Sequence, residues 1–295
     1  MKLKVLHILL SFFLLSTCSD RTPGHSEAIS QNGKSYWYNG DAEITSYQLN
    51  QARYGEMRNG KAVLVFVTEP FSPTKYVKAD HPTDNDVSVL KLNFTKKFTT
   101  GIYPYSMMTS TFFPFENGKH SLKISSSSQE WCGNTYMELK NKKKYEIQLN
   151  SYFEGESFNK KLLDKHLLED DIWSIIRLQP DQLPTGEMEV IPSFFYLRFM
   201  HKEAKTYSCH LSKNTKGDTV SYSITYPELD RSLTIQFENA SPYKIIGWQE
   251  TYYSGWGNKR KKLTTTATRI KTLKIDYWNK NSNAFSGLRD ELGLE

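Results

Sequence analysis

The sequence predicts a mainly β protein: an antiparallel curved sheet, or open half-barrel, built from two meanders with a central helical insert (α+β). Three observations predict this class. From Tyr36 onward, short apolar and aromatic runs, many with period-two alternation, are separated by turn residues. Between Asn159 and Leu178 the apolar spacing becomes helical. Aromatic residues make up 14% of the chain, which favours broad curved sheets.

Residues 1–17 have the features of a secretory signal peptide, with lysines before an apolar run, Val5 to Leu15, that is too short to cross a bilayer. The run ends in Leu15-Ser16-Thr17-Cys18, which resembles the lipobox of bacterial lipoproteins. That resemblance implies cleavage before Cys18 and acylation of its thiol, and two or more acyl chains anchor a protein stably. We therefore expect a lipid-anchored envelope protein, and Ser19 favours the outer membrane, facing the periplasm.

The tether that follows Cys18 leads into the folded part of the chain. Its residues are mostly polar, with Pro23 and Gly24 among them and no apolar periodicity, so we expect a flexible linker. The predicted divisions are a lipidated cysteine and tether (18–35), an N-terminal β meander (36–156), a helical insert (157–184), a C-terminal β meander (185–280) and a tail (281–295).

The N-terminal meander contains the clearest alternation in the chain, with Leu90, Leu92 and Phe94 on one face of a strand. Asn59-Gly60 is its strongest hairpin signal, because this dipeptide suits a tight turn between strands. The serines of SSSSQEWCG, residues 125–133, fall on a strand that leads into the next turn, so they are structural rather than nucleophilic. The expected strands are 42–51, 61–69, 87–98, 102–113, 120–131, 135–140 and 144–153.

The insert and the C-terminal meander follow. Residues 159–178 predict one bent helix or two short ones, ending before Pro180 and Pro184. A short helix is expected near the end, within 285–292. The expected strands of this half are 187–191, 193–200, 207–211, 219–226, 232–238, 243–253 and 262–278.

The charge balance excludes one class of partner. The formal net charge is +6, spread over many residues of mixed sign, so the chain lacks the basic footprint of a nucleic-acid-binding protein. The short basic clusters KKFTTG, KNKKKY and NKRKK lie between apolar segments and predict solvated turns or sheet edges, with a lipid-headgroup patch as the alternative.

Cysteine usage suggests a disulfide. With Cys18 lipidated, Cys132 and Cys209 remain in an oxidising compartment, and we expect them to be joined. Two separate buried thiols are the alternative. No Cys/His group has zinc spacing, so neither a metal nor another cofactor is expected.

Aromatic residues provide the candidate ligand-binding site. Trp248, Tyr252, Tyr253 and Trp256 cluster on one strand and its turn, and they line either a core or an apolar groove. Glu130 and Trp131, beside Cys132, complete the candidate set. The chain has none of the common hydrolase or phosphate-binding motifs, so no catalytic residue is assigned.

Four segments carry a resemblance to a known group of proteins. SYWYNGDAEITSYQLNQARYGEMRNGKAVLVFVTEPFS, TGIYPYSMMTS, SLKISSSSQEWCG and SLTIQFENASPYKIIGWQETY resemble an uncharacterised family of bacterial envelope lipoproteins. Some members are labelled septum formation inhibitor Maf. Maf proteins are similar to α/β nucleotide pyrophosphatases with an S-x-S-x-R-R segment, and this chain has neither that segment nor an αβ alternation. Its strand pattern is similar instead to half-barrel lipoprotein carriers, in which a curved sheet wraps a helix and an acyl ligand.

These observations favour a non-enzymatic, membrane-anchored protein that binds a lipid, another hydrophobic ligand or an envelope partner. One alternative is an envelope hydrolase with an unfamiliar site, in which Glu130, His120 or His210 acts as acid or base. Another is a structural partner of an outer-membrane assembly that uses sheet edges and aromatics. An apolar pocket of more than roughly 300 Å³ would favour the ligand-binding interpretation.

Overall fold

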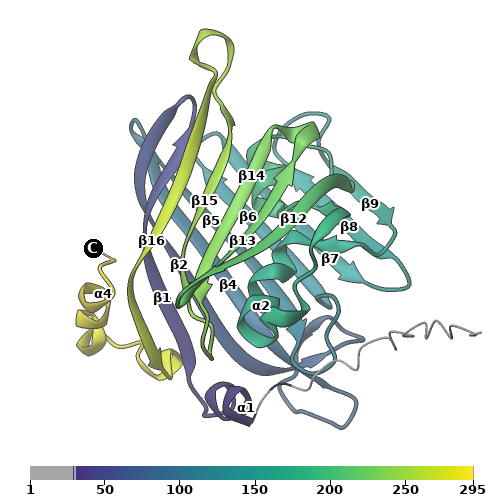
Figure 1. Ribbon diagram of the computed structural model, residues 1–295, viewed down its shortest axis with the longest axis vertical. Helices are drawn as coiled ribbons and strands as arrows, with labels where there is room; N and C mark the ends of the chain where they lie inside the picture. Colours follow the sequence, from purple (N-terminus) through teal and green to yellow (C-terminus); the bar gives the residue numbers. More distant parts are fainter. Residues whose placement is uncertain (1–28, 30, 295) are drawn as a thin grey trace, which may run out of the picture.

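The computed structural model describes residue 29 and residues 31–294. The predicted signal peptide and the predicted lipidation of Cys18 lie outside this part of the chain. Within it the protein is mainly β, as predicted, with one large curved sheet that does not close on itself and few helices. Figure 1 shows this sheet curving around a short helix, α2.

The first half of the sheet is an antiparallel meander. Consecutive strands pair with each other, except that β2 pairs directly with β4 while the short β3 pairs with β2. The strands are β1 (Ala42–Arg53), β2 (Glu56–Ser72), β3 (Val77–Lys78), β4 (Val87–Thr100), β5 (Tyr103–Pro114), β6 (Lys123–Glu130), β7 (Gly133–Asn141), β8 (Tyr145–Ser151) and β9 (Phe158–Leu163).

The second half joins the first through its last strand. Its strands are β10 (Leu167–Leu168), β11 (Gly186–Ile191), β12 (Tyr207–Lys216), β13 (Thr219–Tyr226), β14 (Arg231–Glu238), β15 (Ile245–Ser254) and β16 (Lys261–Ile275). β10 is parallel to β11, and the later neighbours are antiparallel. β16 pairs with β1, so that Ala42 lies opposite Ile275. The two predicted meanders therefore form one continuous sheet with β1 near its middle.

The ends of the strand order, β9 and β10, are connected by residues 164–166. A link of this length spans at most about 14 Å between Leu163 and Leu167. The sheet therefore curls until its two edges come near each other at this point. We call the opening between them the seam.

Two helices fill the concave face of the sheet. Every residue of α2 (Glu169–Leu178) and of α3 (Phe194–Phe199) is buried. The ring of Phe94, on the inner face of β4, contacts both Trp173 of α2 and Phe195 of α3, at centroid distances of 5.1 and 5.2 Å. The remaining α-helices of the described residues are α1 (Gln31–Trp37) and α4 (Gly287–Glu291), and five 3-10 turns lie in the connections. α4 confirms the predicted short helix near the C-terminus.

The predicted hairpin turn at Asn59-Gly60 is wrong, because β2 runs through this dipeptide. The turn lies instead at Tyr54-Gly55, whose φ values of 56° and 78° suit a type I′ turn. A Cβ at Gly60 would lie 2.2 Å from the carbonyl oxygen of Lys97 on β4. Gly60 therefore allows two strands to approach closely, which is another reason for glycine within a sheet.

The helical insert is shorter than predicted, because residues 158–163 form β9 and the helix begins at Glu169. Residues 193–200 were expected to form a strand and instead contain α3. Ser193 caps this helix, and its Oγ accepts a hydrogen bond from the backbone N of Phe195 at 3.3 Å. Because all six residues of α3 are buried, no polar face reveals the helical period in the sequence.

The predicted tether was expected to be a flexible linker, but its last residues, 31–35, lie in a helix. α1 begins at Gln31, and the side chain of Trp37 is buried against Phe66. The hydroxyl of Thr68 on β2 donates to the carbonyl oxygen of Trp37 at 2.8 Å. These contacts attach α1 to β2, so residues 31–35 belong to the folded domain.

Candidate functional site

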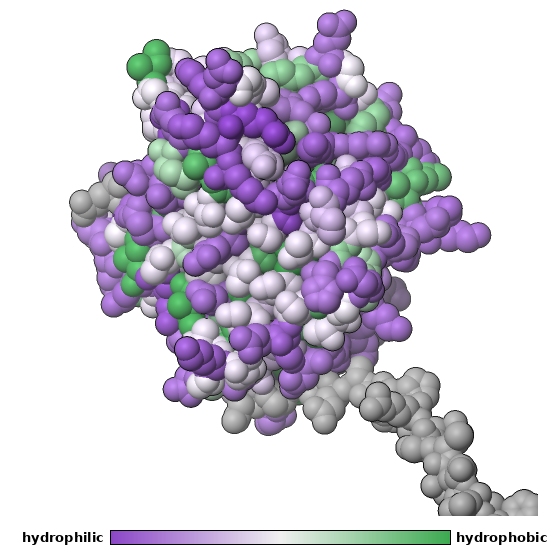
Figure 2. All heavy atoms as spheres, turned by 45° about the horizontal axis from the view of Figure 1, so that its top comes forward, coloured by the Kyte–Doolittle hydropathy of each residue, from purple (hydrophilic) through white to green (hydrophobic). Residues whose placement is uncertain are grey.

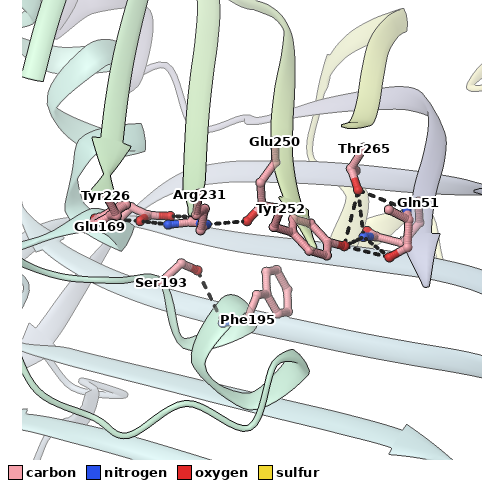
Figure 3. Close-up of polar contacts among 10 residues, drawn as sticks. Gln51, Glu169, Ser193, Phe195, Tyr226, Arg231, Glu250, Tyr252 and Thr265 are labelled. Carbon is pink, nitrogen blue, oxygen red and sulfur yellow. Dashed lines mark hydrogen bonds and ion pairs between the residues drawn. The ribbon is translucent and has the colours of Figure 1, made fainter. Parts of the chain in front are cut away.

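Ion pairs hold the N-terminal turn of α2 inside the curved sheet. Glu169 accepts two hydrogen bonds from Arg231 of β14, both at 2.6 Å, and a third from the hydroxyl of Tyr226 at 2.8 Å. Arg231 also donates from Nε to Glu250 of β15 at 2.8 Å. Figure 3 shows this chain of contacts running from α2 across three strands. All four residues are buried, and the single guanidinium of Arg231 pairs with both carboxylates, so one negative charge is left in excess among them.

The next two residues of α2 attach it to its neighbours. Asp170 accepts a hydrogen bond from the backbone N of Phe194, at the start of α3, at 3.0 Å. Asp171 accepts hydrogen bonds from the backbone N of Ser121 at 3.1 and 3.2 Å and from its hydroxyl at 2.5 Å. Burial raises the pKa of Asp170 to about 6 and the pKa of Asp171 to about 7, against these hydrogen bonds. α2 is therefore a fixed part of the core.

The space beside this network is too small for an organic ligand. Lys96 of β4, Gln51, Glu250 and Tyr252 line a cavity of about 10 Å³, close to the room that a single water needs. Lys96 lies on the inner face of its strand, where burial lowers its pKa. The sequence predicted that the KKFTTG cluster forms a solvated turn or a sheet edge. This is wrong for its first lysine, Lys96, which is buried.

A larger pocket lies at the seam. It has a volume of about 430 Å³ and is bounded by the loop before β6, by the link between β9 and β10, by the C-terminal half of α2 and by β11. We call it the seam pocket. Apolar side chains make up much of its lining: Phe113, Leu167, Ile175, Leu178, Pro184 and Met188. Its size and lining are those of a site for a small apolar ligand.

Two Lys-His pairs lie on one side of the seam pocket. Lys119 and His120 come from the loop before β6, and Lys165 and His166 come from the link that crosses the seam. We call these four residues the Lys-His cluster. Among the described residues that line the pocket, Glu189 is the single carboxylate, and it accepts a hydrogen bond from the hydroxyl of Ser208. The pocket therefore combines an apolar lining with a positive margin.

The ionisation of His120 depends on its surroundings. Burial, followed by the charges of Lys165 and Lys119, lowers the pKa of this imidazole. Its Nδ1 is buried without a hydrogen-bond partner and lies 3.8 Å from Oδ2 of Asp171. The lowered pKa keeps His120 mostly neutral near pH 7, whereas the two lysines, both exposed, are positively charged.

The six residues predicted to bind a ligand do not form one site. Trp248 and Tyr252 are buried in the core, whereas Trp131 and Trp256 are 68% and 66% exposed at two different hairpin tips. The half-buried ring of Tyr253 lies under the guanidinium of Arg260, 3.9 Å from its centroid. The predicted aromatic groove is thus divided between the core and the ends of the strands.

Glu130, the remaining member of that set, is at the tip of β6. It accepts a hydrogen bond from the backbone N of Cys132 at 2.7 Å and lines a cavity of about 20 Å³ with Arg53, Arg198 and His201. Tyr105, Phe153 and Phe199 also line this cavity, but it is too small for a lipid. The structure therefore separates Glu130 from the seam pocket.

The predicted disulfide is also wrong, because Cys132 and Cys209 are both free thiols. Cys132 is exposed in the turn after β6, and Cys209 is buried on β12. Eight strands separate β6 from β12 in the sheet (β13, β14, β15, β16, β1, β2, β4 and β5). A disulfide needs Cα atoms within about 7 Å and facing Cβ atoms. Burial raises the pKa of Cys209 to about 12, so this thiol is protonated and unreactive.

The sequence singled out His120 as a possible acid or base but gave no indication of the seam pocket. The signal that could have found it is the repeated Lys-His dipeptide, at 119–120 and at 165–166, on two connections between strands. Their proximity depends on the sheet curling round, which brings connections 46 residues apart to the same opening.

Neither a family model, nor a curated protein, nor a solved structure matches this chain. Within residues 29 and 31–294, no group of three or more His, Cys, Asp or Glu side chains could hold a metal ion. No helix in the same part of the chain combines the length and the apolar character needed to cross a membrane.

Proposed function

We propose that this protein binds the apolar part of a lipid or similar amphiphile in the seam pocket, without catalysis, while a lipid on Cys18 anchors it in the cell envelope. The observation that carries the proposal is the combination of about 430 Å³ of space with six apolar lining residues. Pockets for small organic ligands have this size and this kind of lining.

The Lys-His cluster supports a ligand with an anionic head. Lys119 and Lys165 are exposed beside the apolar lining, where their ammonium groups can pair with a carboxylate or a phosphate at the mouth of the pocket. A hydrocarbon chain would then lie against Ile175 and Leu178 of α2. Because the hydrogen-bonded ion pair between Glu169 and Arg231 fixes that helix, the pocket is largely preformed.

The anchor is supported by the sequence alone. A signal-like segment followed by the lipobox-like Leu15-Ser16-Thr17-Cys18 favours acylation of Cys18, and Ser19 favours the outer membrane, facing the periplasm. Mass spectrometry of the chain isolated from envelopes tests this part separately. An acylated N-terminal peptide that begins at Cys18 is the expected result, and an unmodified Cys18 would contradict it.

Binding is tested with a fluorescent acyl-chain probe and the secreted chain that starts at Ser19. Ile175→Trp, which fills the pocket, is expected to weaken binding about tenfold or more, equivalent to ~1.4 kcal/mol. The matched control is Ile270→Trp, because Ile270 is 42% exposed on β16 and does not line the pocket. Equal affinities for the two variants would place the probe elsewhere, and absence of binding to the parent chain would contradict the proposed function.

The hydrolase alternative has less support. The groups considered for a hydrolase lie on different elements. Glu130 is at the tip of β6, His120 is in the loop before β6, and His210 is on β12. The ring of His210 pairs with the exposed Glu187 at 2.8 Å. We therefore favour ligand binding over hydrolysis.

A further inference from the structure

The most exposed large apolar side chains gather at one end of the sheet. Within residues 29 and 31–294, four large apolar residues are at least 66% exposed: Ile102 (82%), Tyr152 (70%), Trp131 (68%) and Trp256 (66%). Each belongs to a different strand connection, namely β4–β5, β8–β9, β6–β7 and β15–β16. We call these four residues the hairpin rim.

The register of the strands places these connections at the same end. β15 ends next to the start of β16, and the start of β16 lies beside the end of β1. The end of β1 lies beside the start of β2 at residue 56. Because the following neighbours are antiparallel, β4, β6 and β8 also end on this side of the sheet. Hairpins β15–β16, β1–β2, β4–β5, β6–β7 and β8–β9 therefore follow one another along the rim. In Figure 1 the β15–β16 hairpin projects farthest at the top, and α1 lies at the opposite end.

Packing holds the exposed indoles in place without burying them. The ring of Trp256 lies 5.2 Å from that of Tyr54, and the ring of Trp131 lies 6.3 Å from that of Tyr103. The backbone N of Gly55 also donates to the hydroxyl of Ser254 at 3.2 Å, which fastens the β15–β16 hairpin to the β1–β2 turn. The apolar tips are thus presented to the outside by ordered neighbours.

The projecting hairpin is strongly basic. Lys259, Arg260, Lys261 and Lys262 are all exposed, and residues 255–262 contain no carboxylate. The turn between β13 and β14 contains Glu228 and Asp230, and the β8–β9 connection contains Glu154 and Glu156, so the basic surface is confined to the β15–β16 hairpin. Figure 2, with this end turned forward, shows strongly hydrophilic side chains next to pale and green surface.

We infer that the hairpin rim docks onto an anionic lipid surface. Tryptophan and tyrosine favour the membrane interface, and lysine and arginine beside them attract anionic headgroups. Separate apolar tips, one on each of four connections, suit a fluid interface that each tip enters independently. The positive charge of residues 259–262 favours an anionic surface over a neutral one. This inference goes beyond the proposed function, since the rim lies apart from the seam pocket.

The test uses the full mature chain with Cys18→Ser, so that no acyl chain can anchor it. Flotation with phosphatidylcholine vesicles that contain phosphatidylglycerol is expected to recover the protein, and added NaCl is expected to release it. Trp131→Ala/Trp256→Ala should weaken binding about tenfold or more, and replacement of residues 259–262 by glutamine should do the same. The control is Trp278→Ala, an exposed tryptophan outside the rim, which should bind like the parent.

Tryptophan fluorescence provides a second readout that does not depend on the stability of a variant. Lipids with a quencher in the acyl chain should quench the parent, and this quenching should disappear in the Trp131→Ala/Trp256→Ala variant. Failure of the parent to float with anionic vesicles would overturn the inference, and so would rim variants that bind like Trp278→Ala. A result of this kind would leave the acyl-probe test of the seam pocket unaffected.

Discussion

Arg177, in the last turn of α2, forms a buried ion pair with Glu43 near the start of β1. Its Nη2 donates to Oε2 of Glu43 at 2.7 Å, and its Nη1 donates to Oε1. Both side chains are 1% exposed. The hydroxyl of Tyr36 in α1 also donates to Glu43, so one carboxylate connects α1, β1 and α2.

Replacing one partner of this ion pair should destabilise the protein more than replacing both. Arg177→Met leaves a buried carboxylate without its partner, and we expect the free energy of unfolding to fall by about 3–5 kcal/mol. The double variant Glu43→Leu/Arg177→Met buries no charge at this position and should recover part of the loss. Urea unfolding of the two single variants and the double variant measures this, and additive losses would contradict coupling of the two side chains.

Asp171 should contribute less to the stability of the protein as the pH rises from acid to neutral. Burial raises its pKa to about 7, whereas an unfolded aspartate titrates near about 3.9. Between these values the native state keeps a proton that the unfolded state has lost, so the free energy of unfolding falls as pH rises, by up to ~1.4 kcal/mol per unit. The contribution is complete below about pH 4 and lost above about pH 7.

Asp171→Asn should reduce that slope, because the amide stays neutral at every pH. Asp170, whose pKa is raised to about 6, should supply a remaining slope of the same sign. Asp181→Asn, at an exposed position, is the control and should follow the parent. Urea midpoints measured from pH 4 to 8 decide the matter, and parallel curves for Asp171→Asn and the parent would refute the assignment.

The two free thiols should differ in reactivity. A maleimide is expected to modify Cys132 in the native protein, and Cys209 after unfolding, because Cys209 is buried and its pKa is raised to about 12. Peptide mapping before and after denaturation measures this. Resistance of both thiols to the reagent until a reductant is added would restore the disulfide that the sequence predicted.

Gly60→Ala should destabilise the sheet, since the new Cβ would lie 2.2 Å from the carbonyl oxygen of Lys97. β2 and β4 would have to move apart in the centre of the sheet, and we expect a loss of about 2–3 kcal/mol. Gly287→Ala provides a matched control in α4, because a Cβ there meets no atom within 4 Å. Thermal unfolding compares them, and equal midpoints would mean that the strands adjust freely.

Local pattern was enough to predict the class and most strands of this fold. Residues 219–226, for example, alternate and form β13 over the predicted bounds. Prediction failed where burial removed the pattern. α3 has no polar face, so its aromatic residues indicated a strand, and Gly60 resembled a turn residue although its function is close packing between strands.

The candidate site was harder to predict because it depends on contacts between distant segments. The pairing of β16 with β1 makes one sheet of two meanders, and the curl of that sheet brings Lys119 near Lys165. Neither event has a local signal. The predicted aromatic set failed for a related reason, since period-two alternation along one strand sends Tyr252 into the core and Tyr253 outward.

Photo-crosslinking tests most directly whether an anionic amphiphile binds in the seam pocket. A fatty acid with a diazirine on its chain would be irradiated with the protein, and the labelled peptides would be identified by mass spectrometry. We predict labelling of residues 165–189, which contain Leu167, Ile175 and Leu178, and loss of that label when unmodified fatty acid competes. Labelling confined to other segments, or labelling that does not saturate, would contradict the proposed site.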